Sequence, residues 1–353
     1  MRTKRLRRRL VVGIDGMDVL KVAPQDGGRP PMLDWITRKK RRQAPPVPAP
    51  INPESSPRAY YEEQRRGYEV YLANYMDDRF MRSPRVLSIE TYVKCNATCE
   101  FCPYPTSDRI GQKLDTGIIY KIIDEIAFSD VHPEFFVPSR INEPMFDRRM
   151  YAIFEYVATK LPGTQIGHFT NGTTLSERHI DRLCSTPNLG FINVSLNSHE
   201  PDEHRRLMGL SFELVIKNLK ALHRVYAARS LKFPVNLTRV GDGTKRDTDF
   251  LSWCRSIFPF FQPMCRPRFD WLGKTYAMDV GRAPPGCSQW FALNFLANGR
   301  EALCCIDDDG RFGKGDAHHQ NALDVYNHPI RLALREKKLR SLHPACAACN
   351  AFI

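Results

Sequence analysis

The sequence predicts an α/β fold in which parallel strands alternate with covering helices. From Val86 to Arg266, a pattern of strand, loop and helix repeats about six times, which is typical of a parallel sheet with helices outside it. Six such strands curve into an open partial (β/α)6 barrel, whose functional groups lie where strands lead into loops. A cysteine-rich segment follows and predicts a small C-terminal domain containing a β-hairpin and helices.

The predicted elements follow one another in order along residues 60–280. An amphipathic helix over Tyr60–Met76 leads into the barrel, residues 60–83 forming the lead-in and residues 84–280 the barrel itself. Asp115 is a plausible N-cap for the first covering helix. The strands are predicted at Val86–Tyr92, Glu134–Pro138, Gln165–Phe169, Phe191–Leu196, Val235–Val240 and Gln262–Arg266, and helices at Thr116–Phe128, Asp147–Leu161, Ser176–Cys184, Phe212–Arg229 and Asp247–Ile257.

Composition restricts the class of protein. A chain of 353 residues, 42% of them hydrophobic, accommodates one large domain and a smaller one. No apolar stretch approaches the roughly 20 residues needed to cross a bilayer, and the N-terminus lacks the apolar core of a signal peptide. We therefore expect a cytoplasmic protein with no membrane partner. Its eleven cysteines, several in tight clusters, then indicate metal ligands rather than disulfides.

Most of the positive charge lies in an N-terminal arm, residues 1–59. Residues 1–42 contain thirteen Lys and Arg against four Asp, a net +9 of the chain's +13. A proline-rich stretch follows, and the whole arm is predicted to be disordered. It could contact an anionic partner such as RNA, a membrane surface or an acidic peptide, or be a solvated tail or an over-extended gene start. Because the basicity belongs mainly to the arm, we do not expect nucleic acid as a partner.

Three cysteines lie within eight residues after the first predicted strand, in Cys95-Asn-Ala-Thr-Cys99-Glu-Phe-Cys102. A structural zinc site or an electron-carrying cubane normally takes four protein ligands. Three cysteines with no fourth Cys or His nearby indicate instead an iron with an open coordination position, which could bind a small molecule. A zinc loop and redox-inert surface cysteines are the alternatives on spacing alone.

The C-x3-C-x2-C spacing, with the aromatic Phe101 before the third cysteine, resembles the signature of radical S-adenosylmethionine (SAM) enzymes. The resemblance implies a [4Fe-4S] cluster held by Cys95, Cys99 and Cys102, with SAM chelated at the open iron. In that family an electron from the cluster cleaves SAM to a 5'-deoxyadenosyl radical. The resemblance therefore also implies an external electron donor such as flavodoxin or ferredoxin.

Three further motifs at predicted strand ends agree with this resemblance. Arg140-Ile-Asn-Glu143-Pro144 looks like the family's Gly-Gly-Glu-Pro motif with both glycines replaced, and its Glu143 would help hold the methionine amino group. Thr170-Asn171-Gly172 is similar to the family's Thr-Asn-Gly turn, and Ser195-Leu196-Asn197 resembles its ribose-binding element. Each motif alone is weak evidence, but these three together with the cysteine motif, each at a predicted strand end and in the family's order, are strong evidence for the resemblance. The SAM-binding residues implied are Phe101, Glu143, Asn171, Ser195 and Asn197.

The C-terminal cysteines predict a second metal site. Cys287 precedes an aromatic strand, and Asn298-Gly299 predicts a two-residue hairpin turn. The returning strand, Glu301–Cys305, carries two adjacent cysteines. Cys346-Ala-Ala-Cys349 follows about forty residues later, so four ligands can reach one centre. On local chemistry alone, a zinc ribbon has the same pattern.

After a radical SAM domain, this arrangement resembles the auxiliary-cluster extension called SPASM, and more closely its shortened form, the twitch domain. The resemblance covers roughly residues 84–351, places this domain at residues 281–353 and implies one auxiliary [4Fe-4S] cluster with four Cys ligands. The Gly-x4-Cys spacing favours Cys304 over Cys305, because adjacent strand residues point to opposite faces, although a bulge could reverse this. The candidate ligands are Cys287, Cys304, Cys305, Cys346 and Cys349.

The remaining cysteines and the segment Pro263–Trp271 supply further candidates. Cys184 and Cys254 fall on predicted helices and are most simply core residues. Cys265, at the end of the sixth predicted strand, could donate a hydrogen atom in an epimerase or be a buried structural thiol. Three neighbours in the same segment are candidates for substrate binding or proton transfer: Arg266, Arg268 and Asp270.

Three functions are consistent with these patterns. The first is a radical SAM oxidoreductase that oxidises a small polar intermediate by two electrons, as in the aminocyclitol dehydrogenases that share the twitch architecture. The substrate would be a sugar, an aminocyclitol or a related compound, and the auxiliary cluster would accept an electron. The second is a radical enzyme that modifies a peptide and gathers an acidic precursor with the basic arm. The third is a non-catalytic zinc or iron-sulfur protein.

Overall fold

The structure, a computed structural model, describes residues 56–76, 78–279, 281 and 283–351, all within one compact unit of the chain. The predicted basic arm, residues 1–59, lies almost entirely outside the described residues, as do residues 280 and 282, where the predicted barrel meets the predicted C-terminal domain. No helix among the described residues combines the length and apolarity needed to cross a membrane.

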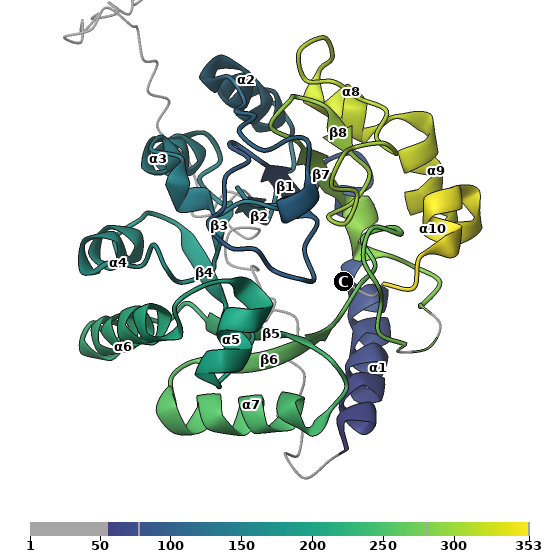
Figure 1. Ribbon diagram of the computed structural model, residues 1–353. Coiled ribbons are helices and arrows are strands. Elements are labelled where there is room, and N and C mark those ends of the chain that lie inside the picture. Colours follow the sequence, from purple (N-terminus) through teal and green to yellow (C-terminus); the bar gives the residue numbers. More distant parts are fainter. Residues whose placement is uncertain (1–55, 77, 280, 282, 352–353) are drawn as a thin grey trace, which may run out of the picture. The chain divides into compact units, whose positions relative to one another are not determined.

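One eight-stranded sheet organises the described residues, in the order β6-β5-β4-β3-β2-β1-β7-β8. The first six strands in the chain are parallel to their neighbours and have helices on their outside, so the predicted partial (β/α)6 barrel is confirmed (Figure 1). These strands are β1 (Val86–Ile89), β2 (Phe135–Val137), β3 (Gln165–Thr170), β4 (Leu189–Ser195), β5 (Val235–Gly241) and β6 (Gln262–Pro267).

Polar side chains cap most of the covering helices, as predicted for Asp115, although Arg149 makes no capping hydrogen bond at the helix that begins at Met150. Asp115 accepts a hydrogen bond from the Gly117 backbone N–H at 2.7 Å, and Ser176 accepts one from the His179 N–H at 3.4 Å. The helices are α1 (Pro57–Tyr75), α2 (Thr116–Ala127), α3 (Met150–Lys160), α4 (Glu177–Cys184), α6 (Phe212–Ala228) and α7 (Lys245–Ile257), with short 3-10 turns η1 (Asp78–Phe80), η2 (Tyr104–Thr106) and η3 (Pro144–Phe146).

The core lies between the strands and these helices. Alternate strand residues such as Leu87, Phe136 and Ile192 are fully buried against helix residues such as Ile119 and Phe154. Because successive strand residues point to opposite faces, the residues between them face the barrel interior. The interior therefore receives a different set of side chains, which includes polar residues of β4 and β5.

Helix α5 (Pro201–Met208) is an element that the sequence analysis missed. It is only eight residues long and ends at Gly209, whose φ of +68° is accessible to glycine without strain. The Thr98 backbone N–H donates to the Met208 carbonyl at 2.9 Å, so α5 packs directly against the loop that follows β1.

The C-terminal segment extends the main sheet. Strand β7 (Ala292–Phe295) pairs in parallel with β1, and β8 (Glu301–Ala302) pairs antiparallel with β7, which confirms the predicted hairpin. Its connection spans residues 296–300 and is longer than the predicted two-residue turn, and β8 ends before the cysteine pair. The remaining elements are η4 (Ser288–Phe291), α8 (Ala322–Tyr326), α9 (Pro329–Lys337), η5 (Arg340–Leu342) and α10 (Pro344–Ala348).

Candidate active site

The loop after β1 brings its three cysteines together at the end of the strand. The thiols of Cys102 and Cys95 lie close enough to Cys99 to act with burial in raising the pKa of the Cys99 thiol. Backbone N–H groups point at two of the sulfur atoms, from Ala97 to Cys95 at 3.4 Å and from Tyr104 to Cys102 at 3.5 Å. Hydrogen bonds of this kind to sulfur are typical of iron-sulfur ligation.

Packing from three directions fixes this loop. The Tyr104 hydroxyl donates to the Cys95 carbonyl at 2.9 Å, and the Trp271 indole donates to the Phe101 carbonyl at 2.9 Å. The Glu100 N–H donates to the Leu207 carbonyl of α5 at 3.1 Å. The cysteine side chains are therefore held in place by backbone contacts that leave their sulfur atoms available.

The described residues contain no group of three or more His, Cys, Asp or Glu side chains arranged around one metal ion. Thiols that hold a [4Fe-4S] cluster bind different irons of the cluster and need not converge on a single point. The three thiols with their N–H···S contacts fit such a cluster.

Glu143 lies beside the cysteine loop, as the motif predicted. Its N–H donates to the Lys94 carbonyl at 2.8 Å. Its carboxylate accepts hydrogen bonds from the Asn171 N–H at 2.7 Å and from the hydroxyls of Thr170 and Thr174 at 3.0 and 3.1 Å. Burial raises the pKa of Glu143 to about 7, although these hydrogen bonds favour the charged form. Glu143 thus joins the loop after β2 to the turn after β3.

Asn171 brings the turn after β3 to the same cysteine. Its side-chain amide donates to Asn96 Oδ1 at 2.8 Å and lies 3.8 Å from Cys95 Sγ. The next residue, Gly172, has a φ of +83°, and a Cβ there would lie 3.0 Å from Val215 Cγ1. Glycine is therefore needed for the turn that presents Asn171.

The two residues predicted from the end of β4 have different environments. Ser195 is half-buried, and by strand alternation it faces the barrel interior. Asn197 is 1% exposed with a φ of +62°. Its Oδ1 accepts a hydrogen bond from the Val240 N–H at 2.8 Å, and its side-chain nitrogen lies 3.2 Å from Met208 Sδ. The Asn197 side chain thus joins the end of β4 to β5 and α5.

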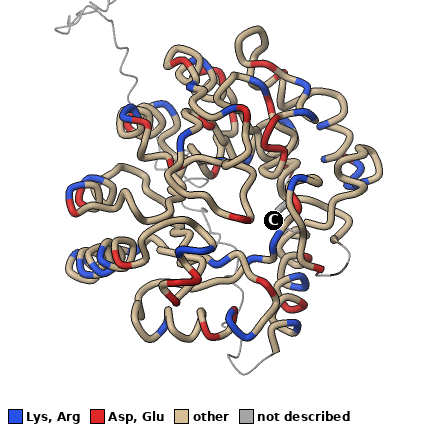
Figure 2. Tube along the Cα trace, viewed as in Figure 1, with Lys and Arg blue, Asp and Glu red and all other residues tan. Residues whose placement is uncertain are grey.

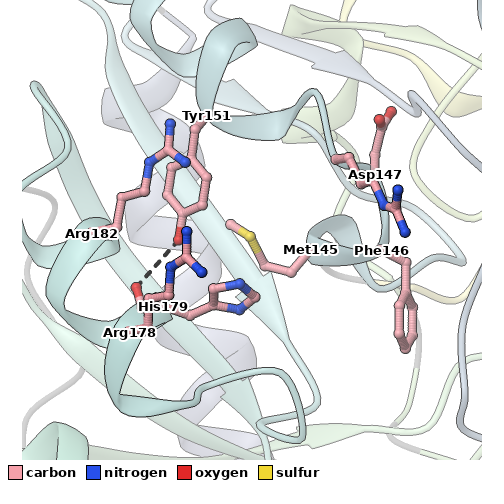
Figure 3. A pocket seen from close by; sticks show the side chains of 8 residues that line it. Met145, Phe146, Asp147, Tyr151, Arg178, His179 and Arg182 are labelled. Atoms are coloured by element: carbon pink, nitrogen blue, oxygen red, sulfur yellow. Dashed lines mark hydrogen bonds between the residues drawn. The ribbon is translucent and has the colours of Figure 1, made fainter.

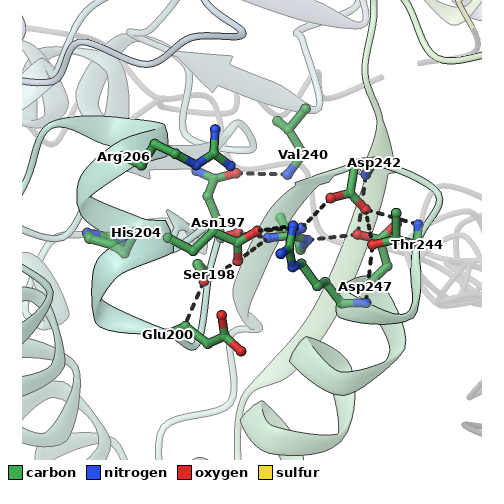
Figure 4. A network of polar contacts seen from close by, with 12 residues as sticks. Asn197, Ser198, Glu200, His204, Arg206, Val240, Asp242, Thr244 and Asp247 are labelled. Atoms are coloured by element: carbon green, nitrogen blue, oxygen red, sulfur yellow. Dashed lines mark hydrogen bonds and ion pairs between the residues drawn. The ribbon is translucent and has the colours of Figure 1, made fainter.

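Figure 4 shows a network of polar contacts that includes Asn197, Asp242 and Asp247. A buried arginine that the sequence did not indicate supports this network. Arg239 of β5 is 1% exposed and donates to Asp247 at 2.7 Å and to Glu203 and Asp242 at 3.1 Å. It also donates to the Asn197 carbonyl. Burial alone would raise the pKa of Glu203, but hydrogen bonds from Ser198 and Arg239 hold it below its ordinary value.

The candidates after β6 separate into two groups. Arg268 is 5% exposed, donates to Glu100 at 2.8 Å and lies with its guanidinium 5.7 Å from the centre of the Phe101 ring, so it contacts the cysteine loop. Cys265 is fully buried in the layer between β6 and α7, where its thiol donates to the Asp247 carbonyl at 3.5 Å.

Arg266 and Asp270 complete this segment. Arg266 follows Cys265 and points to the opposite face of β6, toward the interior, where it is exposed. The Asp270 carboxylate accepts a hydrogen bond from the Leu272 N–H at 3.0 Å, and its carbonyl accepts from Lys274 at 2.8 Å. Asp270 therefore shapes the turn that carries Trp271 to the cysteine loop.

The C-terminal cysteines also gather in one place. Burial raises the pKa of Cys305 to about 12, and this thiol lies within electrostatic range of Cys287 and Cys349. Burial likewise raises the pKa of Cys287 to about 11, with Cys349 and Cys346 nearby. Cys304 interacts with its neighbour Cys305 and with Cys287.

The choice between Cys304 and Cys305 cannot rest on strand alternation as the sequence analysis assumed. Strand β8 ends at Ala302, so the adjacent pair lies in the following turn rather than on a strand. Both side chains are therefore directed by turn geometry, and the expected returning strand, Glu301–Cys305, is wrong in its second half.

Buried N–H groups without partners surround this second group of thiols. Arg140, in the loop after β2, donates through Nη2 to the carbonyls of Cys304 and Asp307 at 2.7 and 2.8 Å. Its Nε and Nη1, and the Trp290 Nε1, are buried without a hydrogen-bond partner among the described residues. Unpaired buried donors are costly, and the sulfide and thiolate groups of a cluster would satisfy them. These residues therefore fit an iron-sulfur cluster.

One buried carboxylate connects the cysteine loop after β1 to the loops after β2 and β7. Glu90 follows β1, is 0% exposed and pairs with Arg109 at 2.5 Å. It also accepts hydrogen bonds from the backbone N–H groups of Ile141 at 3.4 Å and Ala297 at 3.3 Å. The loops that follow β1, β2 and β7 therefore share one anchor.

Comparison with known proteins agrees with this geometry. Residues 89–243 match the family model of the Radical SAM superfamily. A probable GTP 3',8-cyclase from Methanosarcina mazei is 28% identical over 153 residues, which cover 41% of this chain and 43% of that protein. The match therefore spans less than half the length of this curated relative.

Solved structures share the fold at low sequence identity. They include BtrN in complex with AdoMet and 2-DOIA (14% identity, 76% of this chain and 93% of that chain, TM-score 0.53). SuiB from Streptococcus suis bound to the precursor peptide SuiA has 15% identity over 82% of this chain and 74% of that chain, with a TM-score of 0.58. Native anSMEcpe with bound AdoMet and Cp18Cys peptide has 11% identity over 73% of this chain and 84% of that chain, with a TM-score of 0.52. At these identities the likeness concerns the fold alone.

Proposed function

We propose, since residues 89–243 form a radical SAM domain, that this protein is a radical SAM oxidoreductase with an auxiliary [4Fe-4S] cluster. The substrate we propose is a small polar intermediate such as a sugar or an aminocyclitol, oxidised by two electrons. The observation that supports this best is the presence of two groups of thiols, each with N–H groups close by: backbone N–H groups at Cys95 and Cys102, and the buried donors of Arg140 and Trp290 near the C-terminal thiols.

Eight residues would serve the first cluster and SAM. Cys95, Cys99 and Cys102 would hold a [4Fe-4S] cluster, which would supply the one-electron reduction on which SAM cleavage depends. Glu143 would hold the methionine amino group, and Asn171 orients the turn beside Cys95. Ser195 would bind the ribose from the barrel interior, while Asn197 holds the end of β4 in position. Phe101 would line the cofactor from the cysteine loop, backed by Arg268.

The auxiliary cluster would be held by Cys287, Cys346, Cys349 and one of the adjacent pair Cys304 and Cys305. Arg140 and Trp290 would donate their free N–H groups to it. Iron and acid-labile sulfide analysis of anaerobically purified protein tests both clusters. We expect about eight iron atoms per chain; one or two zinc atoms with no iron would support the non-catalytic alternative instead.

Polar side chains on the interior faces of β4 and β5 favour a small polar substrate. Asn193 and Thr238 are joined by a 3.1 Å hydrogen bond, and Asn236 is half-buried on the same face. The experiment is anaerobic incubation with SAM, dithionite and a panel of deuterated aminocyclitols and sugars. Deuterium transfer into 5'-deoxyadenosine with formation of a ketone would support the proposal. No transfer from any panel member, with transfer from a peptide, would refute it.

A second candidate is peptide modification, because SuiB, whose solved complex contains a precursor peptide, shares the fold over 82% of this chain. Deletion of residues 1–58 distinguishes the two. An enzyme that gathers an acidic precursor with the basic arm loses precursor binding on deletion, whereas an enzyme for a small substrate keeps its activity.

A further inference from the structure

A cavity of about 500 Å³ lies outside the barrel, between η3 and the helices α3 and α4 (Figure 3). It is separate from the interior where substrate would meet SAM, since its lining comes from the covering helices and the turn before α3. The residues that define its character are Phe146, Arg148, Tyr151, Arg178, His179 and Arg182.

The side chains exposed in this cavity carry positive charge. Arg148 and Arg178 are exposed, and neither has a carboxylate at ion-pair distance in the part of the chain that the structure describes. The Arg182 guanidinium lies 3.9 Å from the centre of the Tyr151 ring. Its ion pair with Glu155 is long, at 3.8 Å, and both side chains are exposed to solvent. Asp147, the one carboxylate in the lining, is buried and bound to Arg149 at 2.7 Å.

The cavity is next to the cysteine loop. The Lys94 ammonium lies 5.6 Å from the centre of the Phe146 ring, and Lys94 directly precedes Cys95. His179 Nδ1 lies 2.8 Å from the Thr174 carbonyl, and the adjacent Thr173 accepts a hydrogen bond from Asn96 at 3.0 Å. Contacts through Phe146 and Lys94, and through His179, Thr173 and Asn96, therefore connect the cavity lining to both chain neighbours of Cys95.

Other parts of the cysteine loop pack against apolar side chains. Cys99 and Phe101 pack against Leu207 and Met208 of α5, and Cys102 packs in a cluster with Trp271. Lys94 and Asn96, in contrast, are exposed on the cavity side. Because electron transfer needs close approach, the exposed residues on either side of Cys95 would let a donor come near the cluster from the cavity.

The basic surface continues across α4 to α6. Arg178 lines both this cavity and a second one, of about 1150 Å³, which also presents Lys217, Lys220 and Arg224. Two carboxylates, Glu177 and Glu213, line the second cavity. Figure 2 shows blue positions along α4 and α6.

We propose that this basic surface over α3, α4 and α6 is the docking site of an acidic one-electron carrier protein of the flavodoxin type. The inference rests on the proposed function, because it supposes a cluster at Cys95, Cys99 and Cys102. In the step it serves, the reduced carrier loses one electron and the cluster gains it, with no bond made or broken. Its position among the covering helices makes it a surface for a protein rather than for the substrate.

The test compares the double variant R178Q/R182Q with the matched control K232Q/K337Q, which removes two exposed charges elsewhere. Binding of oxidised flavodoxin is measured by calorimetry at low salt, and 5'-deoxyadenosine formation is measured with photoreduced flavodoxin and, separately, with dithionite. We expect R178Q/R182Q to weaken binding and slow the flavodoxin-driven reaction on the order of tenfold, with the dithionite reaction unchanged and the control like wild type.

Equal behaviour of both variants with flavodoxin would overturn the docking proposal. Slowing by the same factor with dithionite would also overturn it, since the loss would then not concern docking. Normal reduction by flavodoxin with loss of substrate turnover would assign the cavity to an anionic substrate or peptide instead. Failure of wild-type protein to cleave SAM with dithionite refutes the proposed function itself, which keeps the two failures distinguishable.

Discussion

Replacing Arg239 with Met should destabilise the protein strongly, because it leaves buried carboxylates without a partner. Arg239 is 1% exposed, and the side chains of Asp247 and Glu203, which it pairs with, are 1% and 6% exposed. Breaking a buried ion pair by removing one partner costs about 3–5 kcal/mol. A folded unit of roughly 300 residues has an unfolding entropy of about 0.6 kcal/mol/K, so 1 kcal/mol corresponds to about 1.6 °C and we expect Tm to fall by about 5–8 °C.

The matched control is R246M. Arg246 is 3.8 Å from the same Glu203, but its side chain is 56% exposed, and such exposed pairs contribute about 0–1 kcal/mol. Thermal unfolding followed by circular dichroism compares the two variants. Hydrogen exchange should also rise at α5 and at the end of β4, since Arg239 donates to the Asn197 carbonyl. A fall in Tm no larger for R239M than for R246M would refute this reasoning.

Four further predictions concern the two sites. C99S should lose about half of the iron and all 5'-deoxyadenosine formation, and full iron retention by elemental analysis would contradict this. Of C304S and C305S, one should keep the auxiliary iron and the other lose it; loss in neither would argue against a ligand at this pair. R140Q should keep iron but lower the reduction potential of the auxiliary cluster, measured by EPR-monitored titration, because two donors near its sulfurs are lost. Burial raises the pKa of Glu143 to about 7, so the folded protein binds one more proton than the unfolded chain between the ordinary carboxyl pKa and that pH. The free energy of unfolding should therefore fall as pH rises through this window. Urea unfolding at several pH values should show a flatter slope for E143Q.

The sequence predicted the barrel well because the spacing of apolar residues differs between its strands and its helices. The strands β1 to β6 begin within two residues of their predicted positions, since each is a short apolar run between polar loops. Helix α5 was missed because it has few apolar residues and only eight positions in all. Its role depends on packing against the cysteine loop, and no local pattern indicates such a contact.

The candidate site was predictable where a motif has fixed spacing and was not where residues distant in sequence meet. Cys95 and Glu143 come together as their motifs implied. Arg239 and Arg140 carry no local signal, because an arginine in a strand or a loop is usually solvent-exposed. Their importance arises only when folding buries them among partners from other strands.

Glu90 ties the radical SAM-like barrel to the C-terminal hairpin. It directly follows the strand that leads to Cys95, and β7, which pairs with that strand in parallel, leads to the loop containing Ala297. A buried carboxylate needs several donors to offset desolvation, and here they come from Arg109, Ile141 and Ala297. A shift of any one of these loops would leave Glu90 short of a donor. Glu90 therefore couples the position of the connection between β7 and β8 to the loop that carries Cys95, Cys99 and Cys102.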